Sequence, residues 1–246
     1  MNALWTYNDQ DVDPGPNWFL NEPAGFLTGP GPFDAKRDGG TVGPDGLDDC
    51  RTTTLYGLGN VGTCLRLQSP VTQTNLITSY FWRQFSISSD PAQTILHWDG
   101  KVDDGAVLYL NGVELQRLRM PSTTITKATF ASGGVNDGDA PDSFDFIAPA
   151  SLRTGANLLA VELHQSALNS SDLTMGMRVT AVTPPTPRLT ATYSSGSIIL
   201  NWQPNLGELQ YTDNLEAPDW KPIPGATSGY SETANRLRRF YRVVLH

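Results

Sequence analysis

The chain has 246 residues, a length that corresponds to one or two domains. Its formal net charge is −8 and its pI is near 4.8, and no basic cluster occurs beyond Arg236, Arg238 and Arg239; these features exclude a typical nucleic-acid-binding surface. No run of about 20 apolar residues is present, so the sequence predicts no membrane span.

Residues 1–70 are dense in Pro, Gly, Asp and Asn, which predicts loops and no long strands. Aromatic residues interrupt this stretch, and we expect them to hold the loops against the face of a β-sandwich, because large apolar rings bury the most surface. These residues are Trp5, Tyr7, Trp18, Phe19, Phe26 and Phe33.

Strand patterns begin at Ile77, where the aromatic and β-branched segment ITSYFWRQFSI ends at the turn SSDP. In DDGAVLYLNGVELQRL, segments 106–110 and 113–115 flank Asn111-Gly112, which is the strongest signal for a two-residue type I′ hairpin turn. The further strand-like segments of this part are QTILHWDG, TITKATFA, FDFIAP, NLLAVELHQ and LTMGMRVTAV.

The segment TPPTP (183–187) predicts a stiff, extended connector. Beyond it, RLTATYS, SIILNWQ, GELQYTD and RRFYRVVL are strand-like again. No segment shows a helical period for more than about two turns, so the predicted fold class is all-β. We expect one unit over 1–182 and a small second β-module over 188–246.

The two cysteines, Cys50 and Cys64, flank a Gly- and Thr-rich stretch. A disulfide closing this loop would stabilise the fold by roughly 3 kcal/mol, and the alternative is two buried free thiols. A zinc site lacks ligands, because no histidine lies near the pair. The sequence begins without a basic segment followed by an apolar one, so either the protein is cytoplasmic or a leader peptide has been removed. We expect the second, an extracellular protein whose Met1 was supplied for expression.

Acidic residues suggest two cation sites. Asp103 and Asp104, with Asp172 and backbone carbonyls, could hold a structural Ca²⁺, which takes 6–8 oxygen ligands. The alternative is a hydrogen-bond network that joins the Asp103–Gly105 turn, the Glu162-x-His164 pair and the loop before Asp172. The second candidate is the acidic loop 136–139 with Asp142, for which a solvated loop is the alternative.

The motif DDGA-V-YLNG-E--R--MP, followed by G-N-LAVE-HQ---SSD, resembles a galactose-binding-like β-sandwich module of secreted Planctomycetes and Verrucomicrobia proteins. The hairpin alone also resembles the jelly-roll sugar-binding domain of family 2 glycoside hydrolases. The resemblance covers residues 3–182 and implies a jelly-roll β-sandwich with an accessory, sugar-binding role. This sequence departs from the module in residues 34–68, an inserted Asp- and Gly-rich stretch that carries both cysteines.

The tail LNWQ…LQYTDNLEAPDWKPIPG…RFYRVVL resembles a short C-terminal β-module of verrucomicrobial surface proteins. This second resemblance implies a fold and an extracellular setting, and no activity.

Aromatic side chains are the candidate ligand-binding residues, because the apolar face of a sugar ring matches an aromatic face and polar neighbours orient it. Trp5, Tyr7, Trp18 and Trp98 lie in or near predicted loops, whereas Trp82 and Trp202 lie in strand patterns and are expected in the core. For each single aromatic a place in the core is the alternative.

No catalytic residue is predicted, because the sequence has no G-x-S-x-G elbow, phosphate-binding loop, dinucleotide fingerprint or HExxH motif. The leading hypothesis is therefore a non-catalytic carbohydrate-binding module that binds polysaccharide, with a catalytic domain in the parent protein as a further partner. A structural or adhesive surface module and a glycan-active enzyme with a cryptic site are the alternatives.

Overall fold

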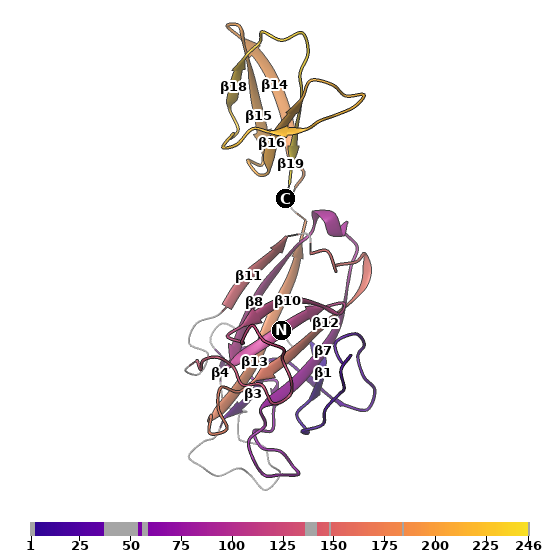
Figure 1. Ribbon diagram of the computed structural model, residues 1–246, viewed down its shortest axis with the longest axis vertical. Coiled ribbons are helices and arrows are strands. Elements are labelled where there is room, and N and C mark those ends of the chain that lie inside the picture. Colours follow the sequence, from indigo (N-terminus) through magenta and orange to yellow (C-terminus); the bar gives the residue numbers. More distant parts are fainter. Residues whose placement is uncertain are drawn as a thin grey trace. The chain divides into compact units, whose positions relative to one another are not determined.

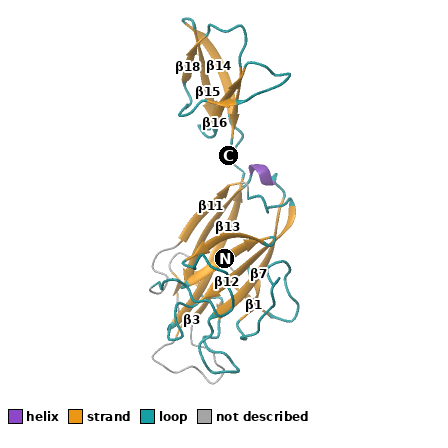
Figure 2. Cartoon of the chain, viewed as in Figure 1, coloured by secondary structure: helices purple, strands orange, loops and turns teal. Residues whose placement is uncertain are grey.

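The computed structural model describes residues 3–36, 54–55, 59–135, 142–147, 149–183 and 185–245. The chain divides into two compact units, Met1–Val182 and Thr183–His246, and the second begins with the TPPTP segment. Nearly all of the described regular structure is β (Figures 1 and 2), as the sequence predicts. The described helix is one 3₁₀ turn at Pro91–Gln93. None of the described residues forms a helix long and apolar enough to cross a membrane.

The first unit is a sandwich of two sheets. Its six-stranded sheet has the order β10-β9-β12-β7-β1-β2, and its five-stranded sheet has the order β11-β8-β13-β3-β6. Every pairing in these two sheets is antiparallel except the short parallel contact between β3 and β6. The strands of the six-stranded sheet are β1 (Leu4–Asn8), β2 (Leu27–Pro30), β7 (Thr78–Ile87), β9 (Gly105–Leu110), β10 (Val113–Leu118) and β12 (Gly155–His164). Those of the five-stranded sheet are β3 (Phe33–Lys36), β6 (Thr63–Cys64), β8 (Ile95–Asp103), β11 (Asp142–Ile147) and β13 (Asp172–Val182). A separate two-stranded pair is formed by β4 (Thr54–Leu55) and β5 (Gly59–Asn60).

The core of this sandwich follows from the alternation of side chains along its strands. Successive residues of a strand point to opposite faces, so every second residue of each inner strand faces the partner sheet. In β12, Val161 and Leu163 are fully buried between the sheets, while Glu162 points to the outer face of the six-stranded sheet. Burial of apolar surface between the two sheets is the main stabilising contribution, at about 25 cal/mol per Å².

The hairpin predicted at Asn111-Gly112 is confirmed. β9 ends at Leu110, β10 begins at Val113, and the two turn residues have φ values of 51° and 85°, as a type I′ turn requires. The Asn111 side chain also donates to the Ser151 carbonyl at 2.6 Å and to Asn157 Oδ1 at 2.8 Å. The turn is therefore anchored both to the loop before β12 and to the start of β12.

One predicted strand is wrong. The segment TITKATFA, residues 124–131, forms turns and loop instead of a strand. Its polar and apolar residues alternate, but long-range contacts fix its path: the Thr78 hydroxyl donates to the Lys127 carbonyl at 2.8 Å. This loop borders the site described below.

The second unit has two three-stranded sheets, ordered β14-β15-β18 and β17-β16-β19. A small core holds them together, with Leu200, Trp202 and Leu209 almost fully buried. Trp202 is therefore a core residue, as expected. The strands are β14 (Arg188–Ser194), β15 (Ser197–Gln203), β16 (Glu208–Thr212), β17 (Lys221–Pro222), β18 (Tyr230–Thr233) and β19 (Phe240–Val244).

Candidate functional site

The floor of the candidate site is the outer face of the six-stranded sheet, where three neighbouring strands meet. β7 contributes Tyr80, β12 contributes Glu162 and β9 contributes Tyr109. Tyr80 lies directly opposite Glu162 in the pairing of β7 with β12. These side chains share one face because they alternate with inward residues such as Phe81 and Val161.

One wall comes from the loop between β1 and β2. Trp18 contacts the rings of Tyr80 and Tyr109 edge-on, with centroids 4.8 and 5.4 Å apart, and Phe19 stacks on Tyr109 at 4.8 Å. The backbone of this loop is also tied to the sheet, because the indole N–H of Trp82 donates to the Trp18 carbonyl at 2.8 Å. The aromatic residues of this proline-rich loop thus hold it on the sandwich face, as the sequence predicts for Trp18 and Phe19.

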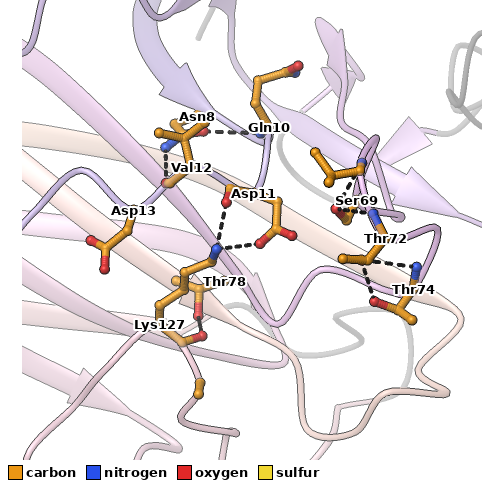
Figure 3. Close-up of polar contacts among 12 residues, drawn as sticks. Asn8, Gln10, Asp11, Val12, Asp13, Ser69, Thr72, Thr74, Thr78 and Lys127 are labelled. Atoms are coloured by element: carbon orange, nitrogen blue, oxygen red, sulfur yellow. Dashed lines mark hydrogen bonds and ion pairs between the residues drawn. The ribbon is translucent and has the colours of Figure 1, made fainter.

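The opposite wall is the loop 124–127, and Lys127 joins the two walls (Figure 3). Its Nζ lies 2.5 Å from Asp11 Oδ1 and 2.6 Å from the Asp11 carbonyl oxygen. Burial alone would raise the pKa of Asp11, but hydrogen bonds from Lys127 and Ser69 outweigh it and lower that pKa. The charge of Lys127 is thereby compensated by a carboxylate.

Floor and walls border an open hollow of about 430 Å³, called here the aromatic hollow. This volume lies within the range of roughly 300–1,000 Å³ that is usual for ligand sites. Four aromatic residues line it, together with Asp13, Glu162 and Lys127. The aromatic residues are Trp18, Phe19, Tyr80 and Tyr109.

Glu162 is the buried polar group of the floor, with only 3% of its surface exposed. Its Oε1 accepts a hydrogen bond of 2.6 Å from the Tyr109 hydroxyl. Burial, followed by the hydrogen bond to Glu162, raises the pKa of Tyr109, so this hydroxyl stays protonated. Burial also raises the pKa of Tyr80, and the charges of Glu162 and Asp13 raise it further. The charge of Glu162 thus acts on both tyrosine hydroxyls.

His164 lies behind Glu162 and is fully buried. Its Nδ1 is 2.8 Å from the Thr129 carbonyl oxygen, which can only accept, so Nδ1 carries a proton and donates. Its Nε2 lies 3.4 Å from Glu162 Oε2. The pair joins the floor of the aromatic hollow to the loop that follows residue 127. Glu162 and His164 are buried together, as expected, but the contacts of His164 are with Thr129 and Thr78, whereas the predicted network holds the Asp103–Gly105 turn.

Three of the four predicted ligand-binding aromatics are buried in the core, which is the alternative that the sequence left open for each of them. Trp5, Tyr7 and Trp98 are 6%, 8% and 1% exposed, and all three pack in the main core between the sheets. Trp5 and Tyr7 lie on β1 and Trp98 on β8, where alternation turns their rings inward. Trp18 is the predicted residue that the structure places in the aromatic hollow.

The predicted calcium residues take part in other contacts. Asp104 is almost fully buried, and its carboxylate accepts from Ser166 N at 2.6 Å, from Val135 N at 3.3 Å and from Ser170 Oγ at 3.4 Å. Asp103 is also fully buried, and Asp172 begins β13 opposite Lys36. Across the described residues, no three acidic, histidine or cysteine side chains gather as metal ligands. The contacts of Asp104 agree with the hydrogen-bond interpretation.

The remaining predicted site residues are only partly covered by the structure. Cys64 ends β6, but Cys50 lies outside the described residues, so the disulfide stays a prediction. Residues 136–141 of the acidic loop lie outside them as well. Asp142 is described, and both its oxygens lie 3.0 Å from the guanidinium of Arg119.

Sequence reasoning missed Tyr80 and Tyr109 as site residues because both lie in strand patterns. The available signal was alternation: each is an aromatic at an outward position between residues that belong to the core. The loop 124–127 gave no such signal, since its place depends on contacts with residues far away in the chain.

A second hollow, of about 360 Å³, opens between the two sheets beside Trp5, Phe85 and Met177. Its lining is mainly apolar, and its charged side chains are Arg83 and Arg178. It lacks the combination of several rings with a buried carboxylate that distinguishes the aromatic hollow.

No family model and no curated protein matches the chain. Among solved structures, it is similar to a β-glucuronidase of an uncultured Clostridium species, with 14% identity, a TM-score of 0.41, and coverage of 96% of this chain and 39% of that one. It is also similar to a β-glucuronidase from glycoside hydrolase family 2, with 14% identity, a TM-score of 0.44, and coverage of 98% and 26%. It is similar as well to the β-glucuronidase of Ruminococcus gnavus, with 10% identity, a TM-score of 0.41, and coverage of 96% of this chain and 39% of that one. The chain thus spans well under half of these proteins, and at such low TM-scores the likeness decides nothing about its function.

Proposed function

We propose that this chain is a non-catalytic carbohydrate-binding module of a secreted or cell-surface protein and that the aromatic hollow holds part of a polysaccharide. The observation that carries the proposal is the combination of four aromatic rings with the buried carboxylate of Glu162 in one hollow of about 430 Å³. Rings and fixed acceptors together are what sugar recognition requires.

The chemistry of the aromatic hollow fits a sugar ring. A pyranose has C–H groups on its faces, which pack on aromatic rings, and hydroxyls at its rim, which donate to carboxylates. Glu162 is held in place by Tyr109, and Asp13 is held by Gly15 N, which donates to its Oδ1 at 2.8 Å. Acceptors fixed in this way lose little side-chain entropy when a ligand binds.

Affinity electrophoresis tests the proposal. The whole chain is run through gels that contain plant or algal polysaccharides, and we expect retardation by at least one of them. Substitution Phe19→Ala should weaken this retardation about tenfold or more, because it removes one ring of a loop wall without changing a strand of the floor.

Tyr193→Ala is the matched control, because Tyr193 is a 72% exposed aromatic of β14 in the second unit. This variant should be retarded like the unchanged chain. If no polysaccharide retards a correctly folded chain, or if both variants lose retardation equally, the proposed site is wrong.

A further inference from the structure

The sandwich of the first unit has an open side, where two of its long strands lose a neighbour. The pairing of β1 with β7 covers residues 6–8 and 80–82, and the pairing of β3 with β13 covers residues 33–36 and 172–175. Beyond these points, within the described residues, β7 keeps β12 as its partner and β13 keeps β8. The second hollow, of about 360 Å³, is lined largely by these half-paired parts of β7 and β13, and it is called here the edge hollow.

Most of the edge hollow is lined by residues that would belong to the core of a closed sandwich. Phe85, Met177 and Val179 hold inward positions on their strands and pack against the main core, but they are only partly buried. Apolar surface that stays in contact with water is unfavourable, and a bound apolar group would cover it. Met177 can adapt to the shape of such a group, because its thioether side chain is unbranched.

Arg83 brings a charge to an inward position of the same strand. It lies between the core residues Phe81 and Phe85 of β7, while the alternating residue Trp82 belongs to the outer face. Its side chain is partly exposed, and within the described residues its guanidinium makes one hydrogen bond, from Nη1 to the Leu4 carbonyl, and no ion pair. Because a guanidinium has five N–H donors, most of them remain available to a ligand.

The acidic groups of neighbouring strand positions lie on the outer faces of the two sheets. Glu22 accepts a hydrogen bond from Gln84 at 2.9 Å on the outer face of the six-stranded sheet. Asp99 lies opposite Arg178 in the pairing of β8 with β13, so Arg178 has an acidic neighbour of its own. No acidic residue is among the described residues that line the edge hollow. The hollow therefore combines apolar surface with the guanidinium of Arg83.

We propose that the edge hollow binds a small amphiphile that carries a carboxylate, with its apolar body between the sheets and its carboxylate on Arg83. A guanidinium presents parallel N–H groups that match the two oxygens of a carboxylate. A cationic head group would instead place a second positive charge beside Arg83. The volume lies within the range of roughly 300–1,000 Å³ that is usual for small-molecule sites. The inference is independent of the carbohydrate-binding proposal, because the two hollows share no lining residue.

Calorimetric titration of the whole chain near neutral pH tests the inference, with each probe kept below the concentration at which it forms micelles. The probes are decanoate, decanamide with the same apolar body and an uncharged head, decylammonium with a cationic head, and butanoate with the carboxylate and little apolar body. We expect decanoate to bind at least tenfold more tightly than decanamide and decylammonium. Butanoate should bind too weakly to be measured, because it covers little of the apolar lining.

Three variants locate the site. Arg83→Gln removes the charge, so it should weaken the binding of decanoate about tenfold and leave that of decanamide unchanged. Ala181→Phe adds a ring at an exposed position of the lining, so it should weaken the binding of both probes and stays informative if Arg83→Gln perturbs the fold. Arg153→Gln is the matched control, because Arg153 is an exposed arginine of the same unit outside the lining. It should bind decanoate like the unchanged chain.

Three results would overturn the inference. The first is binding of decanamide or decylammonium as tight as that of decanoate, and the second is an equal loss of decanoate affinity in Arg153→Gln and Arg83→Gln. The third is absence of binding of every probe; sedimentation velocity then shows whether a second copy of the chain covers the edge hollow instead. Each of these results leaves the carbohydrate-binding proposal standing, since retardation by polysaccharides tests it separately.

Discussion

The Tyr109 hydroxyl donates a hydrogen bond of 2.6 Å to Glu162 Oε1, and the two residues come from the paired strands β9 and β12. This bond crosses the floor of the aromatic hollow and fixes the rotamer of its buried carboxylate. The same tyrosine ring stacks on Phe19 of the loop wall, with ring planes 8° apart. Tyr109 therefore links the sheet, the loop and the carboxylate.

Substitution Tyr109→Phe should reduce the free energy of unfolding by about 1–3 kcal/mol, because the buried Glu162 carboxylate loses its hydroxyl donor while ring packing is kept. Chemical denaturation followed by near-ultraviolet circular dichroism measures this change. Tyr193→Phe, at an exposed position of β14, should change stability by less than about 0.5 kcal/mol. A Tyr109→Phe variant as stable as the unchanged chain would show that the bond contributes nothing.

Asp104→Ala should cost about 3 kcal/mol of stability, because it removes the acceptor of two partly buried backbone N–H groups, those of Ser166 and Val135. Asp104→Asn, which keeps one carbonyl oxygen, should cost less. Denaturation with calcium and with a chelator separates the two interpretations of this residue. We expect equal losses in both conditions; a chelator that destabilises the unchanged chain as much as Asp104→Ala does would favour the calcium site.

The fold was predictable where a local sequence pattern indicates which face of a strand is buried or where the chain turns back. Alternation in β7, β8, β12 and β13 and the Asn111-Gly112 turn indicate strands, a hairpin and a sandwich. The same alternation, applied to β8, would have assigned Trp98 to the core, since it separates Leu96 and Trp98 from the half-exposed His97. The prediction that Trp98 lies in or near a loop therefore gave it the wrong position.

The aromatic hollow was less predictable because contacts between distant segments build it. Lys127 and Asp11 meet across 116 residues of chain, and Trp82 and Trp18 across 64. Neither contact leaves a periodic pattern in the sequence that could have predicted it. Trp5 and Tyr7 were misplaced for a related reason: the short strand β1 lies in a loop-rich region, and its pairing with β2 and β7 turns both rings inward.

Arg119→Lys should reduce stability by about 1–3 kcal/mol, although it keeps the charge. The Arg119 guanidinium binds both oxygens of Asp142 at 3.0 Å and donates to the carbonyls of Asp104 and Val102 at 2.6 Å. A lysine has no planar fork and cannot replace this set of bonds. Arg236→Lys is the control, because its contact with Asp213 spans 4.0 Å between exposed groups. Equal stability of the two variants in thermal denaturation would contradict the role given to Arg119.

His97 should titrate above the ordinary value near 6.5 in the folded chain. The hydrogen bond from its Nδ1 to Asp145 Oδ1, at 2.6 Å, is the largest cause of the raised pKa, and the charge of Asp99 adds to it. Because the folded-state pKa is raised, the stabilising contribution of this pair is complete below the unfolded-state pKa and is lost as the pH rises through the folded-state pKa.

Nuclear magnetic resonance titration of the imidazole measures the pKa directly. Asp145→Asn should lower it toward the ordinary value, whereas Asp219→Asn in the second unit should leave it unchanged. If the imidazole of the unchanged chain titrates at or below the ordinary value, the Asp145 contact does not hold the proton.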